Sequence, residues 1–335
     1  MTLSNSVADH PAYPFVTIAI PTFNRAAFLK GCVASALAQT YPHFEVLVSN
    51  NASSDDTIGV LNSFNDVRLR VLNQSTNIGL HPNLNACVTN AKGDYIVIVP
   101  DDDRITPWLL ERCAGLIRQQ PQLATVVTLS DTHATGRTKP ARTSRFHGTG
   151  IWDGTDILMD FLTDQITVTM CSIMMRTELV RERGGIPLNL PHTADVGTWA
   201  PLLFLGKAGF VNEVCATFTC HDESETARLG LEQLLQDGRK VADLITHMAD
   251  IHVADPQQRR SIQIQARRCF ARRGLIALSD YRLSGGGVQA LLNVMWQFRF
   301  DLYSVNLKSV LRFIVAVLCP QSLATQLRQF RRGLA

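Results

Sequence analysis

Short apolar runs alternate with amphipathic stretches along the first hundred residues of the chain. Four mostly apolar runs predict strands, at Phe15–Ile20, Phe44–Val48, Val67–Leu72 and Tyr95–Val99. The stretches between them have helical spacing, at Ala26–Gln39, from the turn-forming run Asn50–Asp56 through Phe64, and at Asn83–Ala91. We expect the first strand to stop at Pro21. This alternation of strands and helices is typical of βα units with a mostly parallel sheet, that is, an α/β fold.

The alternation continues less regularly in the middle of the chain. Thr106 is expected to cap a helix that has Pro107 as its first residue and ends near Arg118. Strands are predicted at Leu123–Leu129, Thr167–Met175 and Phe210–Thr219, and helices at Thr177–Arg183 and Asp195–Leu205. The segment Ser130–Thr149 is polar, basic and rich in turn formers, so we expect a mobile loop there.

Beyond Arg228 the sequence becomes Leu-, Arg- and Gln-rich and helical, with interruptions at Pro256, Gly285–Gly287 and Pro320. The charge changes at the same place. Residues 1–227 hold 16 basic and 22 acidic side chains, a net charge of −6, whereas residues 228–335 hold 16 basic and 7 acidic ones, a net charge of +9. We therefore predict a flexible N-terminus at 1–14, an α/β domain at 15–227 and a basic amphipathic helical region at 228–335.

Composition narrows the class of protein. The chain has 335 residues, of which 46% are hydrophobic and 18% charged, as in soluble globular proteins. Its eight cysteines are scattered without a CxxC pair, which favours buried free thiols in a reducing cytosol over a zinc site or disulfides. No export signal is recognisable, and the apolar stretch Phe313–Cys319 is too short to span a bilayer.

Three consecutive acids, Asp101, Asp102 and Asp103, follow the predicted strand Tyr95–Val99. The carboxyl ends of parallel strands form the edge where open α/β sheets bind ligands. Adjacent carboxylates repel one another unless they are solvated or bridged by a cation, and carboxylate-bound Mg²⁺ commonly shares its coordination with substrate phosphates. From position alone, a solvated acidic turn is the alternative to a metal site.

Several motifs occur in an order that resembles a known enzyme family. The segments VTIAIPTFNR, FEVLVSNNASSDDT and NIGLHPNLNACVTNAKGDYIVIVPDDDRITPWLLE are similar, in this order, to the inverting nucleotide-sugar glycosyltransferases of family two. The resemblance covers about residues 15–225. It implies the GT-A fold: a Rossmann-like, mostly parallel sheet flanked by helices, here with a C-terminal helical extension. It also implies a nucleotide-sugar-binding half at about 15–120 and an acceptor-binding half at about 121–227.

The resemblance assigns residues to the donor and to a divalent metal, Mn²⁺ or Mg²⁺. Asn50 and Asn51 stand where the family usually has an acid that recognises the base, and Asp101 and Asp103 match its DxD motif. His221 falls where a late histidine of the family approaches the metal or the diphosphate. The implied donor-binding residues are Pro21, Thr22, Asn24, Arg25, Asn50, Asn51, Asn77, Asp101 and Asp102, and the implied metal ligands are Asp101, Asp103 and His221.

On the acceptor side, Gly184-Gly185 matches the glycines before the acceptor loop, and Asp195 falls where the family has its catalytic base. A sugar hydroxyl is a poor nucleophile at neutral pH, so a carboxylate must accept its proton as the new bond forms. One such displacement inverts the anomeric carbon. Read without the resemblance, an acid before an apolar helix is often only an N-cap.

Three departures from the family pattern affect these assignments. Asn50 and Asn51 replace acids, and because an amide both accepts and donates, a UDP-, dTDP- or GDP-linked donor remains open. Pro100 stands where many relatives have a further acid, and Ala194 replaces the customary Glu beside the base.

The basic region at 228–335 has arginine pairs among apolar residues. The pairs are Arg259-Arg260, Arg267-Arg268, Arg272-Arg273 and Arg331-Arg332. Basic amphipathic helices can lie on an anionic membrane surface, and the alternative is a helical cap on the catalytic domain. No RNA-binding module is recognisable, so a nucleic-acid partner is not expected.

Together these features predict a metal-dependent inverting glycosyltransferase. It would move a sugar from a nucleoside diphosphate to a hydroxyl of a glycan or lipid-linked saccharide, in bacterial surface polysaccharide synthesis. We expect a cytoplasmic protein that can bind at the inner face of the membrane. One alternative is a sugar-1-phosphate nucleotidyltransferase, but such an enzyme should have a glycine-rich phosphate loop after the first strand, and the segment PTFNRAAF has no glycine. The other alternative is a catalytically silent scaffold that binds nucleotide sugars.

Overall fold

The computed structural model describes residues 13–134, 136–145, 147–221, 230–283 and 287–297, together with residues 310, 311, 313 and 314. Most of the predicted flexible N-terminus, the predicted interruption at Pro320 and the pair Arg331-Arg332 lie outside these residues.

Ten strands of the described chain form one sheet, in the order β3-β2-β1-β4-β9-β6-β10-β5, with β7 on β6 and β8 on β10. They are β1 (Val16–Thr22), β2 (Phe44–Asn50), β3 (Leu69–Asn73), β4 (Tyr95–Ile98), β5 (Arg104–Ile105), β6 (Thr125–Ala134), β7 (Arg137–Lys139), β8 (Gly150–Asp153), β9 (Ile173–Arg176) and β10 (Lys207–Cys220). The strands from β3 to β4 are parallel, as predicted, and β9 introduces antiparallel pairing on both its sides.

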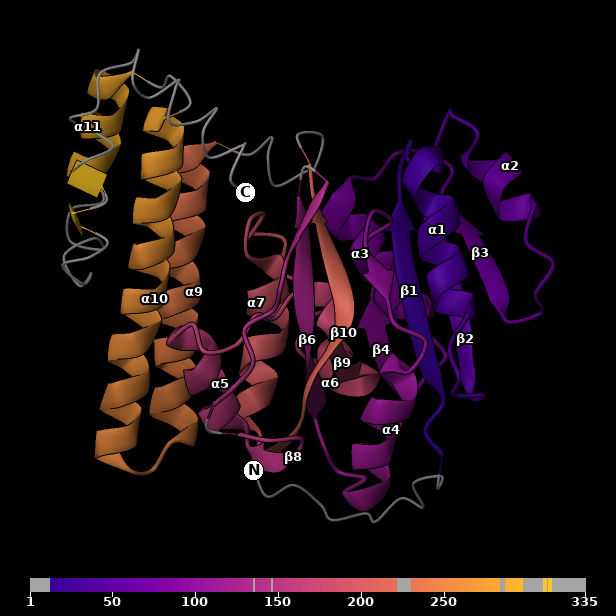
Figure 1. The fold of residues 1–335 in the computed structure, drawn as a ribbon, viewed down its shortest axis with the longest axis horizontal. Coiled ribbons are helices and arrows are strands. Elements are labelled where there is room, and N and C mark those ends of the chain that lie inside the picture. The colour runs from indigo at the N-terminus through magenta and orange to yellow at the C-terminus, as the bar shows by residue number, and fades with distance from the viewer. Residues whose placement is uncertain are drawn as a thin grey trace.

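Helices cover both faces of the sheet, which runs through the middle of the molecule (Figure 1). They are α1 (Ala26–Leu37), α2 (Thr57–Asn62), α3 (Leu80–Asn90), α4 (Leu109–Gln119), α5 (Gly154–Leu162), α6 (Thr177–Glu182), α7 (Ala194–Trp199), α9 (Leu231–His252), α10 (Pro256–Leu283) and α11 (Val288–Gln297), with 3₁₀ helices η1 (Met170–Ser172) and η2 (Ala200–Phe204). The mostly parallel sheet flanked by helices confirms the predicted α/β class.

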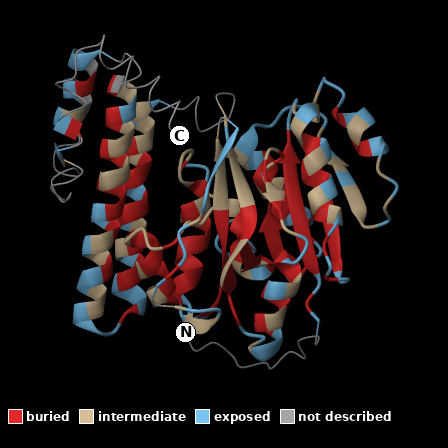
Figure 2. Ribbon diagram, in the orientation of Figure 1, coloured by how far each residue is buried: buried red, intermediate tan, exposed pale blue. Residues whose placement is uncertain are grey.

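The strand side chains divide between two hydrophobic cores, one on each face of the sheet. Successive residues of a strand point to opposite faces, so Ile18 and Ile20 of β1 join α1, α2 and α4 in one core, while Ala19 joins α3, α5 and α7 in the other. Figure 2 shows the resulting buried interior. Because the central strands β1 and β4 are buried on both faces, they are buried at every position and mostly apolar, which is why the sequence shows them so clearly.

The C-terminal helices α9 and α10 pack against the α/β part through their apolar faces. Ile245 of α9 and Ile262 and Cys269 of α10 belong to the same core as Trp199 of α7, and α9 and α10 stand beside α5 and α7 in Figure 1. Arg267 and Arg268 of α10 are exposed on the opposite side. The predicted break at Pro256 is confirmed, since α10 begins there, and α11 begins just after Gly287.

Several predicted element boundaries are wrong. The segment Ser130–Thr149 is not simply a loop, because β6 continues through Ala134 and forms a hairpin with β7. Strand β1 does not stop at Pro21 but runs to Thr22; its pairing with β4 ends at Ala19, so the missing amide costs no bond on that side.

Helix α4 begins at Leu109 rather than at Pro107, and the Thr106 side chain does not cap it. Only the last three residues of the predicted strand Thr167–Met175 lie in a strand, β9, because the 3₁₀ helix η1 occupies Met170–Ser172 before it. The short elements β5, β8 and α5 have no counterpart in the prediction.

The cysteines in the described part of the chain agree with the prediction of buried thiols. These seven cysteines are free thiols, six of them buried and Cys220 exposed. Among the described residues, no helix is both long and apolar enough to cross a bilayer.

Candidate active site

Two loops meet at the carboxyl edge of the sheet. Strands β1 and β4 are parallel neighbours, but the chain leaves β1 toward β2 on the other side, so the strand order reverses between β1 and β4. Open α/β sheets leave room for a ligand at such a reversal. The loop after β1 carries Asn24 and Arg25, and the loop after β4 carries the three acids, as the sequence predicts.

Arg25, Asp102 and His221 come together at this edge from distant parts of the chain. Arg25 Nη1 donates to Asp102 Oδ2 at 2.9 Å and lies 3.1 Å from His221 Nε2. His221 Nε2 is also 2.9 Å from Asp102 Oδ2. Phe28 of α1 stacks on the His221 ring, with the ring centroids 4.9 Å and the planes 11° apart. This stacking holds the imidazole facing Asp102.

Asp101 and Asp103, on either side of Asp102, are buried. Burial raises the pKa of Asp101 to about 7, which the neighbouring Thr22 hydroxyl opposes, and it raises the pKa of Asp103 to about 8, which the Asp102 charge reinforces. Asp103 Oδ1 accepts from the Thr219 amide at 2.8 Å, but its Oδ2 has no hydrogen-bond partner among the described residues. These two carboxyls are short of positive charge around them.

The donor set at this edge suits a divalent cation. Carboxylate oxygens with one imidazole are ligands that Mn²⁺ accepts, and the unpaired Asp103 Oδ2 marks unmet demand for a positive charge. The contacts of His221 within the described residues are with Asp102, Arg25 and Phe28 rather than with Asp101 or Asp103, the other predicted ligands. No group of three or more His, Cys, Asp or Glu side chains is gathered as a cation site in the part of the chain that is described.

Asn50 and Asn51, at the end of β2, are 3% and 2% exposed. Asn51 Oδ1 accepts from the Ile78 amide at 2.9 Å, and its Nδ2 donates to Asn77 Oδ1 at 2.8 Å. Asn50 Nδ2 donates to Asn73 Oδ1 at 2.9 Å. Because these side chains are buried and already hydrogen-bonded, their geometry favours a role in holding the loop after β3 over direct recognition of a nucleotide base.

The loop after β1 is tied to the loop after β2. Asn24 Oδ1 accepts from the Ser54 amide at 2.7 Å, and the Asn24 amide donates to Ser53 Oγ at 2.9 Å. Asn24 and Ala52 have φ of 53° and 57°. This left-handed backbone costs about 1–2 kcal/mol at a non-glycine residue and persists only where the surroundings impose it. Pro21 and Thr22, the last residues of β1, lead directly into this tied loop.

Asp195 lies in the first turn of α7. The helix begins at Ala194 with Thr193 as its N-cap residue, so Asp195 does not occupy the N-cap position that the alternative interpretation requires. Burial raises the pKa of Asp195, and the Val196 amide and the positive charge of Arg273 oppose that rise. A carboxylate with a raised pKa accepts a proton more readily, which suits a general base.

Helix α9 holds the segment that precedes Asp195. Asp237 of α9 is fully buried, and its Oδ2 accepts from the His192 amide at 2.7 Å. Gln233 Nε2 donates to Asp237 Oδ1 at 2.8 Å. A buried carboxylate needs such partners, so α9 and the segment before α7 are held together at this point.

The glycine pair that the sequence singled out ends α6. Gly184 and Gly185 have φ of 84° and 80°. A Cβ on Gly185 would lie 2.2 Å from Asn85 Oδ1, and Asn85 bonds both backbone groups of Ile186, at 2.7 Å and 3.0 Å. Glycine is required at Gly185 for its backbone angle and for this close approach.

Comparison with known proteins places this site in a family. The family profile described as "Glycosyl transferase family 2" matches residues 17–183, which include the loops after β1, β2 and β4. The chain belongs to glycosyl transferase family 2.

Relatives of this family 2 chain include polysaccharide synthases. Hyaluronan synthase of Pasteurella multocida is 28% identical over 226 residues, 66% of this chain and 22% of that protein. Chondroitin synthase of Pasteurella multocida (strain Pm70) is 28% identical over 220 residues, 64% of this chain and 22% of that protein. This chain thus spans about a fifth of the length of these relatives. An uncharacterized glycosyltransferase of Rickettsia typhi is 27% identical over 66% of this chain and 68% of its own length.

Solved structures share the fold. Residues 1–349 of S. aureus TarS in complex with UDP-GlcNAc superpose with a TM-score of 0.64 at 16% identity, over 94% of this chain and 92% of that one. The mannosyltransferase PcManGT from Pyrobaculum calidifontis, in complex with GDP-Man and Mn²⁺, gives 0.55 at 16% identity, over 93% and 88%. The predicted GT-A fold is thereby confirmed.

Three residues of this family 2 site are absent from the sequence-based prediction: Phe28, Asp237 and Arg273. Phe28 lies within the predicted helix Ala26–Gln39, and nothing in its spacing indicates the stacking on His221. The other two lie in the C-terminal helices, outside the resemblance. The one signal for Asp237 in the sequence is that it is an acid at a core position of a helix. A fully buried acid must have a partner, so such a position calls for one.

Proposed function

We propose that this chain is a metal-dependent inverting glycosyltransferase that moves a sugar from a nucleoside diphosphate to a hydroxyl of a glycan or lipid-linked saccharide. The observation that carries the proposal is the meeting of Arg25, Asp102 and His221 at the strand-order reversal of a family 2 domain. Polar side chains from three distant segments meet there.

On the donor side, Asp101, Asp103 and His221 would hold the cation, and Asp102 pairs with Arg25 beside them. A divalent cation, when bound, supplies positive charge for the departing diphosphate. Arg25 places a second positive charge at the same point. The crystallised relatives with UDP-GlcNAc, and with GDP-Man and Mn²⁺, support a nucleotide-sugar donor. The loops tied by Asn24, Asn51 and Asn77 would form the nucleotide side of the site.

On the acceptor side, Asp195 would accept the proton of the attacking hydroxyl. The hydroxyl oxygen bonds to the anomeric carbon on the face opposite the leaving diphosphate, the bond to the diphosphate oxygen breaks with its electron pair, and the proton moves to the Asp195 carboxylate. One displacement inverts the configuration, and no covalent enzyme intermediate forms. The raised pKa of Asp195 supports this role.

The setting we propose is the synthesis of a bacterial surface polysaccharide, in the cytoplasm or at the inner face of the membrane. The hyaluronan and chondroitin synthases among the relatives support a polysaccharide product. Because α9 and α10 use their apolar faces inside the core, they act as a helical cap. A membrane contact would fall to residues such as Leu292 and Trp296 of α11, which are exposed.

A thermal-unfolding screen of UDP, dTDP and GDP, each with and without Mn²⁺, tests the proposal. A ligand at a hundred times its Kd stabilises the native state by about 2.7 kcal/mol, so one nucleotide should raise the Tm, and the rise should depend on Mn²⁺. Asp103→Asn should abolish the Mn²⁺-dependent part. The absence of any nucleotide-dependent shift would overturn the proposal, and nucleotide binding without turnover of any nucleotide sugar would favour the silent scaffold.

A further inference from the structure

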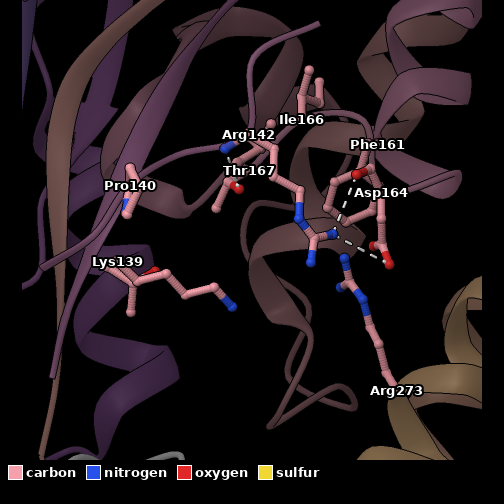
Figure 3. A pocket seen from close by; sticks show the side chains of 10 residues that line it. Lys139, Pro140, Arg142, Phe161, Asp164, Ile166, Thr167 and Arg273 are labelled. Carbon is pink, nitrogen blue, oxygen red and sulfur yellow. Dashed lines mark hydrogen bonds and ion pairs between the residues drawn. The ribbon is translucent and has the colours of Figure 1, made fainter. Parts of the chain in front are cut away.

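A polar pocket of about 170 Å³ lies between the β6–β7 hairpin, the segment after α5 and helix α10. Figure 3 shows the side chains of Lys139, Arg142 and Arg273 pointing toward one another around it. The remaining lining side chains include Asp164, Thr167 and Phe161. The volume is several times that of a water molecule, about 30 Å³, so the pocket has room for a carboxylate or phosphate group.

The pocket carries more positive than negative charge. Asp164 is its one acid in the described lining, and that acid is already engaged by two arginines. Arg272 Nη2 lies 2.7 Å and Arg142 Nη1 3.4 Å from Asp164 Oδ2. Neither Lys139 nor Arg273 forms an ion pair within the described residues. Lys139 and Arg273 therefore face the pocket with no described carboxylate within ion-pair distance.

The Arg273 side chain is held in place by contacts with two aromatic rings. Its guanidinium lies over the Phe161 ring, 4.5 Å from the centroid, and 5.5 Å from the centroid of Phe270. Cation–π contacts hold the side chain without using up its N–H donors. A solvated surface arginine, the ordinary alternative, would have no such support.

The pocket is joined to the helix that carries Asp195. Phe161, in its wall, meets the Trp199 ring of α7 edge to face at 4.8 Å. Arg273 is also close enough to Asp195 to lower the pKa of that carboxyl. The pocket therefore lies on the side of Asp195, whereas the loops assigned to the donor lie at the ends of β1, β2 and β4.

We propose that Lys139, Arg142 and Arg273 form a subsite for an anionic group of the acceptor, so that the acceptor is an acidic saccharide. The anionic group is a carboxylate of a uronic acid or a phosphate of a phosphodiester-linked chain. The inference rests on the proposed function and adds to it the chemical class of the acceptor. It also gives α10 a part in the site.

Binding of three probes to the full chain, loaded with UDP and Mn²⁺, tests this subsite. The probes are trigalacturonic acid, a glycerol-phosphate trimer and neutral maltotriose, titrated calorimetrically at low and physiological salt. One acidic probe should bind roughly tenfold more tightly than maltotriose, and its identity distinguishes carboxylate from phosphate. Lys139→Gln and Arg273→Gln should each remove most of that preference. Arg268→Gln, at an exposed position of the same helix, is the matched control and should change nothing.

Lys139 is exposed, so its variant keeps the fold intact even if the Arg273 variant, which loses its contacts with two rings, is destabilised. Equal binding of acidic and neutral probes, no binding of either acidic probe, or an unchanged preference in Lys139→Gln would each overturn the inference. The nucleotide shift measured on the same samples reports separately on the proposed function, since it does not involve this pocket.

Discussion

Polar side chains on the donor side of the site bond to one another, whereas on the acceptor side Lys139 and Arg273 have no ion-pair partner in the described residues. Asn51 donates a hydrogen bond to Asn77, and Asn24 accepts one from the Ser54 amide, so the loops that carry these residues are tied to one another. The acceptor side combines segments far apart in the chain, from the β6–β7 hairpin to α10.

This difference indicates a division between preformed loops after β1, β2 and β3 and a proposed acceptor subsite that needs its ligand to balance charge. A buried network whose members satisfy one another is rigid and costs little to organise on binding. Cations without partners, in contrast, contribute binding energy only when an anion arrives. Variation in acceptor can then be achieved by changes in the hairpin and in α10 while the donor loops stay the same.

Replacement of the proposed base should separate the two sides most sharply. Asp195→Asn removes the proton acceptor but keeps the shape, so transfer should fall by roughly 10²–10⁴-fold. The affinity for the nucleotide with Mn²⁺ should stay within a factor of two or so, because the donor loops are untouched. Steady-state transfer and calorimetric nucleotide binding measure the two effects. Wild-type transfer by the variant would eliminate Asp195 as the base.

The pH dependence of transfer should follow the same carboxylate. Its pKa is raised above the ordinary value by burial, and only the deprotonated form accepts a proton. We therefore expect kcat/KM to rise with pH and to level off above that raised pKa, with about a tenfold loss per pH unit below it. Nucleotide affinity across the same pH range is the control. A profile that is already flat at the ordinary carboxylate pKa would contradict the assignment.

Loss of Asp237, the buried acid on α9, should lower both the stability of the fold and the rate of transfer, because Asp237 holds the segment before α7. Asp237→Ala leaves the His192 amide without its acceptor, which should lower the free energy of unfolding by about 1–3 kcal/mol and reduce kcat. Asp237→Asn keeps an accepting oxygen and should restore most of both. Chemical denaturation and transfer kinetics give the readouts.

Asp243→Ala, at an exposed position of the same helix, is the matched control and should behave as wild type. If Asp237→Ala lowered stability but left kcat unchanged, α9 would support the fold without positioning the base.

How far the sequence predicts these features depends on whether a local pattern encodes them. Strands buried on both faces, such as β1 and β4, leave uninterrupted apolar runs, so the central sheet and the edge where the acids lie follow from the sequence. The short strand β7 has three exposed polar residues, and β8 has only two large apolar residues, so pairing with β6 and β10 determines them rather than propensity.

Long-range placement is what the sequence does not encode locally. Arg273 looks like any arginine of a basic helix until packing sets it between Phe161 and the pocket. The amides of Asn50 and Asn51 suit base recognition by type, yet folding uses them for internal hydrogen bonds.

The smallest expected effect concerns the strain stored in the donor loop. Ala52 holds a left-handed backbone, which costs about 1–2 kcal/mol at alanine and little at glycine, while glycine loses about 0.5–1 kcal/mol more chain entropy on folding. Ala52→Gly should therefore raise the free energy of unfolding by up to about 1 kcal/mol, measured by chemical denaturation. Gly136 in the β6–β7 turn also has a left-handed backbone, so the matched Gly136→Ala should shift stability in the opposite direction. A destabilised Ala52→Gly variant would mean that the donor loop is relaxed as it stands, and the rigidity we ascribe to that side would then rest on its hydrogen bonds alone.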